Sequence, residues 1–165
     1  MTGSPGRPWY THRMFGKPVY HCWFHTQIWL KGHWLHGDSR GFRDAGHRVH
    51  SSGDYKHRPP EGEHAGLHRH NQQHLSQPLF TFTTHHRSIA LELWRKWFNK
   101  RDYPLAALSV SGAHTHLLAK LPSDDPVAAL GWGKKYVSQE LTKADGDVPG
   151  SLFAARGEPK LVKDI

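Results

Sequence analysis

Residues 105–122 read LAALSVSGAHTHLLAKLP, and this stretch decides the predicted fold. The apolar run at 105–110 predicts a short strand, and the Ser-Gly pair that follows it is a turn signal. The run at 114–121 predicts the partner strand of a hairpin, which the next residue, a proline, brings to an end. Because successive side chains of a strand point to opposite faces, His114 and His116 are expected to project together from one face.

The segments before the hairpin predict the first elements of an α+β domain. Residues 19–30 (VYHCWFHTQIWL) alternate in a way that is typical of a strand with one face in the core. Residues 84–100 carry apolar side chains at helical spacing, and Trp94 and Trp97 are expected in the core. The single cysteine, Cys22, is expected to be a small core residue of the first strand.

A second helix and a last strand are predicted after the hairpin. Asp124 or Asp125 can cap this helix, which is expected to run to about Lys143. Residues 152–155 and 160–162 suggest a last strand or hairpin. One side of this helix is expected to carry Val127, Leu130, Val137 and Leu141.

The order of these elements is βαββαβ, the order of the ferredoxin-like fold, with an antiparallel sheet and two helices on one face. We expect residues 1–18 to form a flexible basic tail and residues 19–165 to form this one domain. Residues 32–77 are rich in histidine and glycine, and they predict an insertion after the first strand, either a long loop or an inserted subdomain. Many functions share this fold, so it does not decide the chemistry.

The composition favours a protein that binds polyanions. The chain has 165 residues, a formal net charge of +8, 16 histidines and a pI of about 9.8. A basic surface on a domain of this size favours nucleic acid as the partner. One cysteine excludes an internal disulfide. No run is apolar enough to span a bilayer and no signal-peptide stretch begins the chain, so we predict a cytoplasmic protein without a membrane partner.

The hairpin resembles a known catalytic segment. Residues 105–122 are similar to the histidine-hydrophobe-histidine segment of the HUH endonucleases, most of all the single-tyrosine transposases of small bacterial insertion sequences and their REP-associated relatives. Residues 20–35 resemble the opening strand of that family, and residues 37–56 resemble an insertion in a His-rich branch of it. Thr115 departs from the family pattern, which has an aliphatic residue between the two histidines.

The resemblance implies a reaction on DNA. His114 and His116, with a third polar ligand, would hold Mg²⁺ or Mn²⁺ against a scissile phosphate, where the metal acts as a Lewis acid. A tyrosine would attack the phosphate and form a 5′-phosphotyrosine link, which conserves the broken bond for rejoining. The implied substrate is single-stranded DNA beside a small hairpin, and members of the family commonly form homodimers.

The position of the nucleophile departs from the family pattern. The family tyrosine lies on a helix beyond the last strand, and the chain is expected to lack that helix because it ends at Ile165. Tyr136 is a candidate substitute, since Glu140 follows it on the same face of the second helix and could act as a metal ligand. The alternative interpretation is that Tyr136 is an ordinary, partly buried helix residue.

The insertion carries two further candidate sites. Its arginines and lysines alternate with aromatic residues, which suits phosphate contacts and base stacking, although a solvated loop is the alternative interpretation. His64 and His68 have chelating spacing if they lie on a helix, so a structural zinc site is a second hypothesis. The residues expected to bind DNA are Arg40, Arg43, Arg48, Tyr55, Lys56 and Arg58.

The sequence therefore leaves three functions open. The first is a metal-dependent, DNA-cleaving transposase domain with His114 and His116 as metal ligands. The second is an inactive or truncated relative that only binds DNA. The third is a His-rich metal-binding protein whose binding to DNA is weak and dominated by salt.

Overall fold

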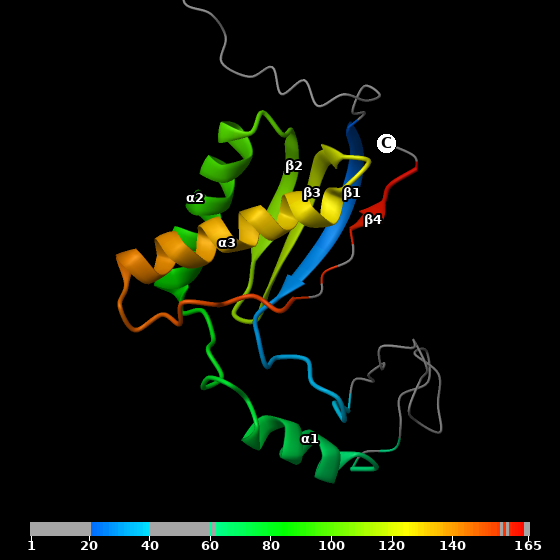
Figure 1. Ribbon diagram of the computed structural model, residues 1–165, viewed down its shortest axis with the longest axis vertical. Helices are drawn as coiled ribbons and strands as arrows, with labels where there is room; N and C mark the ends of the chain where they lie inside the picture. The colour runs from blue at the N-terminus through cyan, green and yellow to red at the C-terminus, as the bar shows by residue number, and fades with distance from the viewer. Residues whose placement is uncertain (1–20, 40–59, 61, 156, 158, 164–165) are drawn as a thin grey trace, which may run out of the picture.

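A four-stranded antiparallel sheet and two long helices form the body of the protein in the computed structural model (Figure 1). The structure describes residues 21–39, 60, 62–155, 157 and 159–163. The order across the sheet is β2-β3-β1-β4, so β3 and β1 are the central strands. The strands are β1 (His21–Trp29), β2 (Leu105–Val110), β3 (His114–Pro122) and β4 (Lys160–Leu161), and the helices are α1 (Ala65–Gln73), α2 (Thr84–Lys100) and α3 (Pro126–Ala144). The expected α+β class with an antiparallel sheet is confirmed.

The two central strands are paired along their whole length. β1 runs antiparallel to β3, from His21 opposite Pro122 to Trp29 opposite His114. β2 pairs with the other edge of β3, and the pairing shifts by one residue between Leu105 and Ala107. β3 is therefore held on both sides, which gives it a fixed register and makes it a rigid support for side chains.

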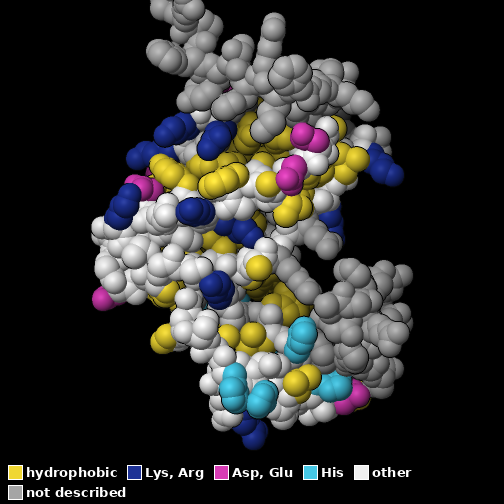
Figure 2. Space-filling model, in the orientation of Figure 1, with side chains coloured by type: hydrophobic (Ala, Val, Ile, Leu, Met, Phe, Trp, Pro, Cys, Tyr) yellow, Lys and Arg dark blue, Asp and Glu magenta, His cyan; other side chains and the backbone are white. Residues whose placement is uncertain are grey.

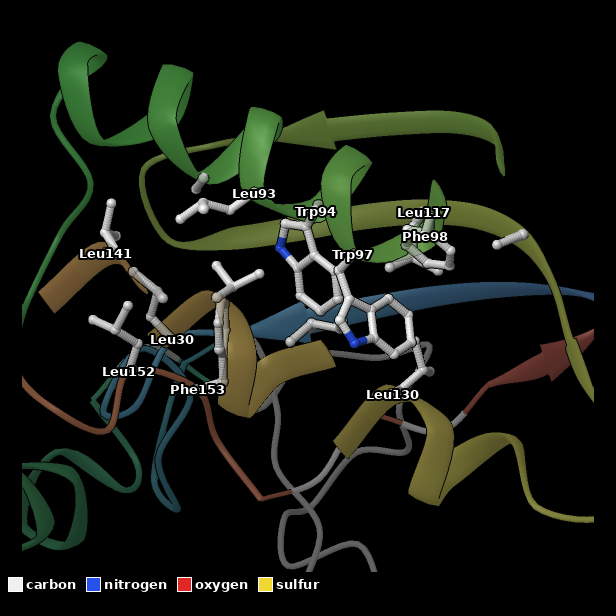
Figure 3. Packing of buried hydrophobic residues seen from close by; sticks show 14 of the residues in the cluster. Leu30, Leu93, Trp94, Trp97, Phe98, Leu117, Leu130, Leu141, Leu152 and Phe153 are labelled. Carbon is white, nitrogen blue, oxygen red and sulfur yellow. The ribbon is translucent and has the colours of Figure 1, made fainter. Parts of the chain in front are cut away.

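The helices α2 and α3 cover one face of the sheet (Figure 1). Side chains from this face of β1 and β3 are buried against them, and we call it the packed face. Trp94 and Phe98 of α2 are fully buried, and Trp97 is nearly so (Figure 3). The core expectation for Trp94 and Trp97 is confirmed, while Cys22 is only partly buried at the edge of this core.

Close contact between the two helices depends on Gly133 of α3. A methyl group at this position would lie 2.6 Å from Cζ3 of Trp94 and 3.3 Å from Cδ2 of Trp97. Both neighbours are rigid rings in a packed core, so neither can move away cheaply. Gly133 is therefore the residue that lets α3 approach α2 closely.

The helix boundaries follow from local capping. The hydroxyl of Thr83 accepts a hydrogen bond from the backbone N–H of His86, and the ring Nδ1 of His86 accepts one from the N–H of Thr83. At α3, the carboxylate of Asp125 accepts a hydrogen bond from the N–H of Ala128 at 2.9 Å, so Asp125 is the cap. These caps satisfy N–H groups that have no partner inside a helix.

One apolar residue at the start of α3 is exposed. Of the four residues expected on one side of this helix, Leu130, Val137 and Leu141 are buried, whereas Val127 is 56% exposed. Val127 lies in the first turn of the helix, directly after its cap, whereas Leu130 is the first of the three that meets the core. The helical period predicted the correct side of the helix but not where along it the contact with the core begins.

The insertion at 32–77 contains a helix, α1, that the sequence pattern did not reveal. No residue of α1 is buried, and α1 contacts no other helix or strand within the described chain. It packs against the loop after β1, where a methyl group at Gly37 would lie 2.5 Å from the backbone nitrogen of His68. Gly37 has a φ of +87°, so both its conformation and the space around it require glycine.

The segment after α3 returns the chain to the sheet. Phe153 forms an isolated bridge with Leu30, and both side chains are buried. The Lys134 ammonium donates hydrogen bonds to the carbonyl oxygens of Ala154 and Ala155, and burial lowers the pKa of this lysine. The expected last strand is present as β4, which has only two residues. Among the described helices, none is long and apolar enough to cross a membrane.

Candidate metal site on the open face of the sheet

The second face of the sheet carries the alternate side chains of β1 and β3. Neither α2 nor α3 packs on it, and no other helix in the described ranges does so; we call it the open face. Its side chains are partly or fully exposed, whereas their neighbours on the same strands are buried, except for the partly buried Cys22. The register assigns to the open face His21, Trp23, His25, Gln27 and Trp29 of β1, and His114, His116, Leu118 and Lys120 of β3.

His114 and His116 lie side by side on this face. Their ring centroids are 4.8 Å apart and their planes are nearly perpendicular, at 82°. Thr115 between them is fully buried on the packed face, so the alternation expected from the sequence is confirmed. Two imidazoles at this spacing on a rigid central strand can bind one metal ion together.

The ring of His114 is held by its own turn. Ser111 Oγ lies 3.0 Å from His114 Nδ1, and the same hydroxyl donates to the His114 carbonyl oxygen at 2.9 Å. The hydroxyl has one proton; if it donates that proton to the carbonyl oxygen, the ring contact is one in which His114 Nδ1–H donates to Oγ. Coordination of a metal by His114 would then use Nε2. The turn that reverses the hairpin therefore also holds the ring of His114 in place.

The ring of His116 is in contact with a residue of the neighbouring strand. His116 Nδ1 lies 3.4 Å from His25 Nε2, and the two ring planes are within 13° of parallel. Gln27 lies directly opposite His116 in the register, and its side chain carries an oxygen donor on the same face. His25 and Gln27 were not recognisable as site residues from the sequence, because only the β1–β3 register brings them to His116.

Aromatic residues surround the histidine pair. The Trp29 ring lies 4.6 Å from the ring of His114, and Trp34 packs against Trp29 at 5.0 Å in a T-shaped contact. Trp34 is 47% exposed. Further along the face, the ammonium of Lys120 lies 5.6 Å above the ring of Trp23. The open face therefore combines nitrogen ligands, stacking surfaces and a cation.

The residues fit a site with two protein ligands. Both histidine rings are oriented through Nδ1, which is how second contacts usually prepare imidazole for a metal. No group of three or more His, Cys, Asp or Glu side chains is arranged to hold a metal in the part of the chain that the structure describes. Water, an amide oxygen such as that of Gln27, or the substrate can fill further positions of a Mg²⁺ or Mn²⁺ ion.

Tyr136 does not lie with the histidine pair. It is half-buried on α3, where it packs against the core on the helix side of the sheet. Glu140 forms an ion pair with Lys143 at 2.6 Å, which raises the pKa of that lysine. Within the described chain, the structure brings no tyrosine beside His114 and His116, and the candidate nucleophile is separated from them by the sheet.

A buried histidine at the end of the helix layer has a structural role. His86 Nδ1 accepts from a backbone N–H, so Nε2 carries the ring proton and donates to Asp145 Oδ2 at 2.9 Å. The His86 hydrogen bond lowers the pKa of Asp145, and the N–H of Asp147 lowers it further. Both ring nitrogens are used, so this pair joins the start of α2 to the end of α3 and does not offer a base to a substrate.

The histidines of α1 lie on the surface of the insertion (Figure 2). His64 is the residue before the helix and lies 3.7 Å from the Glu63 carboxylate. His70 and His74 stack with ring centroids 4.1 Å apart, and His74 Nδ1–H donates to the His70 carbonyl oxygen. The pair His64 and His68 forms no zinc cluster with a third ligand among the residues described here.

The expected DNA-binding residues of the insertion lie outside the described residues. They are Arg40, Arg43, Arg48, Tyr55, Lys56 and Arg58. The basic tail expected at 1–18 also lies outside them. The described surface beside the site contributes Lys120, together with Lys160 of β4, which pairs with His25 across the edge of the sheet.

Comparison with known proteins does not assign the chain to a family. No protein-family model matches it, and no curated protein matches it.

Proposed function

We propose that this chain is a metal-dependent endonuclease and strand transferase for single-stranded DNA, of the single-tyrosine HUH transposase type. The observation that carries the proposal is the pair His114 and His116, with rings 4.8 Å apart on the open face of a central strand. Both rings are oriented through Nδ1 by neighbours, so the pair is prepared to bind before a ligand arrives.

The arrangement of elements supports a ferredoxin-like fold for the domain. With α1 set aside as part of the insertion, the remaining elements follow the order βαββαβ. The two hairpin strands β2 and β3 are neighbours, and β1 pairs with β3 on its other side. In this fold, one face of the sheet is covered by helices and the other is available for a site.

The metal would supply Lewis-acid stabilisation of charge on the phosphoryl oxygens. His114 and His116 would hold it, each through Nε2, and Ser111 and His25 would keep the two rings in place. Such preorganised groups act on a phosphate without reorganising during the reaction.

The open face also suits the proposed substrate. Trp29 and Trp34 offer ring surfaces beside the histidine pair, and base stacking on such rings tolerates any sequence. Lys120 and the net charge of +8 favour the phosphate backbone. A single strand can present both groups at once, whereas the stacked bases of a duplex are not available to tryptophan.

The proposal assigns the metal-binding half of the active site to this chain. Tyr136 remains the candidate nucleophile from the sequence, but in the described arrangement it lies on the helix side. Its attack on the phosphate would break the P–O3′ bond, form a tyrosyl phosphate and leave a 3′-hydroxyl. A covalent adduct that forms with the wild type and not with Tyr136→Phe would identify Tyr136 as the nucleophile.

The test is a cleavage assay on end-labelled single-stranded DNA that carries hairpins from the DNA around the gene. Wild-type protein is incubated with Mn²⁺ or EDTA, beside His114→Ala/His116→Ala, Tyr136→Phe and the control His85→Ala. We expect a protein-linked product that needs Mn²⁺ and disappears in the double variant. His85 is exposed at the start of α2, so its loss should change nothing. Cleavage that survives in the double variant or in EDTA would refute the proposal.

A second candidate function is binding of DNA without cleavage. The position of Tyr136 on the helix side favours it, because a histidine pair that has no tyrosine beside it among the described residues can bind a phosphate without attacking it. This function predicts hairpin binding by the wild type with no covalent adduct. The same assay, with a gel-shift measurement on the same DNA, separates the two.

A further inference from the structure

We propose that His25 is a positioning residue for His116: it accepts a hydrogen bond from His116 Nδ1–H and so leaves Nε2 of His116 with the lone pair that a metal needs. The proposal rests on the proposed function, because it assigns His25 a role toward His116, one of the two histidines proposed to bind the metal. It adds a residue on a different strand, about ninety positions away in the chain, to the site.

The position of His25 follows from strand register. His116 lies directly opposite Gln27, and His25 lies opposite Leu118, so His25 and His116 are diagonal neighbours on the open face. Diagonal neighbours are within reach of long or ring side chains. Their nitrogens meet at 3.4 Å with ring centroids 5.6 Å apart, so the contact is made edge to edge through nitrogen atoms.

The chemistry of two neutral imidazoles gives the contact a direction. One of the two nitrogens must carry the proton and the other must accept it. If His116 Nδ1 carries the proton, its Nε2 holds a lone pair and can bind a metal, whereas the reverse arrangement puts a proton on the nitrogen that must bind. Metal binding through Nε2 therefore selects the arrangement in which His25 is the acceptor.

Each of the two ligands then has its Nδ1 in contact with a neighbouring side chain, and the two neighbours come from different parts of the chain. Ser111, in the hairpin turn, holds Nδ1 of His114 at 3.0 Å. His25, on β1, holds Nδ1 of His116. The His25 side chain is exposed, so burial in the core does not explain a histidine at this position. His21 is a matched comparison, because it lies on the same face of the same strand and its ring contacts Tyr103 at 5.6 Å.

The first test reads the tautomer directly. Nitrogen-15 chemical shifts of the histidine rings in labelled protein, above pH 8 and without metal, distinguish Nδ1–H from Nε2–H. We expect His116 of the wild type to be enriched in the Nδ1–H form and the His25→Ala variant to lose that enrichment. His25→Gln should restore it, because the amide oxygen can accept the same hydrogen bond. An identical His116 tautomer in the wild type and His25→Ala would overturn the proposal, whatever the protein does with a metal.

The second test measures the affinity for Mn²⁺ by calorimetry. We expect His25→Ala to weaken binding about ten- to hundredfold, as loss of such contacts commonly does, and His25→Gln to recover most of it. His21→Ala should bind as the wild type does. If His114→Ala/His116→Ala binds Mn²⁺ as tightly as the wild type, the metal site of the proposed function fails. If that variant loses binding and His25→Ala keeps full affinity, the role of His25 alone fails.

Discussion

The two faces of the sheet are built from the same strands and differ in every contact they make. On the packed face, Phe24, Ile28 and Leu117 are almost completely buried beneath α2 and α3. On the open face, His25 and His116 meet through ring nitrogens and remain accessible. Alternation along a strand therefore separates the residues that stabilise the fold from those that can do chemistry, with no extra element needed.

The histidines of the two regions show the same difference. His86, in the helix layer, has both ring nitrogens in hydrogen bonds and is buried. His116, on the open face, has one nitrogen directed at another imidazole. A histidine with both nitrogens used is a structural residue, whereas one whose second nitrogen faces a site can bind a metal. The abundance of histidine in the sequence does not distinguish these cases.

The largest change in stability is expected at Gly133 of α3, in the helix layer that covers the packed face. Gly133→Ala should destabilise the protein by about 1–3 kcal/mol, because the methyl group would overlap the rings of Trp94 and Trp97. Gly131→Ala is the matched control in the same helix. A methyl group at this position would meet no atom within 4 Å, so Gly131→Ala should stabilise the protein by about 1 kcal/mol through helix propensity. Urea unfolding measures both, and equal effects of the two substitutions would contradict the described packing.

An intermediate effect is expected at Thr115, the residue between the two histidines. Its side chain is fully buried, and its hydroxyl oxygen has no hydrogen-bond partner among the described atoms. Thr115→Val should stabilise the protein by about 1 kcal/mol, because a methyl group replaces an unsatisfied hydroxyl. The affinity for Mn²⁺ should not change, since the substitution lies on the packed face. A loss of stability, or a tenfold change in affinity, would show that the two faces are not independent at this point.

The smallest effect is expected from Asp145 and depends on pH. The hydrogen bond from His86 lowers the pKa of Asp145 in the folded state below its ordinary value of 3.8. A lowered carboxyl pKa adds stability above the ordinary value, and this stability is lost as the pH falls through the folded value. Asp145→Asn should therefore be less stable than the wild type at pH 6, and the difference should shrink as the pH falls below 3.8. Asp147→Asn serves as the control, and a difference that is constant with pH would contradict this account.

The sequence predicted the packed face well because burial leaves a periodic pattern. The bounds of α2 and the hairpin of β2 and β3 agree with expectation, since apolar residues repeat at the period of each element. The helix α1 was missed for the same reason, because its single leucine, Leu67, is 42% exposed and no residue of α1 is buried. β4 has two residues, which is too few for a pattern.

The open face was predicted only as far as local spacing reaches. His114 and His116 are two residues apart, so their common direction follows from alternation alone. His25 becomes part of the site through the pairing of β1 with β3, and Trp29 meets His114 through the same register. Long-range register depends on the whole fold, which is why neither residue was recognisable as a site residue in the sequence.

The most direct test of the account is the position of bound Mn²⁺ relative to two tryptophans on opposite faces. Trp29 contacts His114 on the open face, and Trp94 is fully buried on the packed face. Paramagnetic broadening falls steeply with distance, so at a small fraction of one equivalent of Mn²⁺ we expect the indole N–H signal of Trp29 to broaden before that of Trp94. This broadening should disappear in His114→Ala/His116→Ala. A Trp29 signal that stays sharp while Mn²⁺ binds, or that broadens equally in the double variant, would contradict a metal site on the open face.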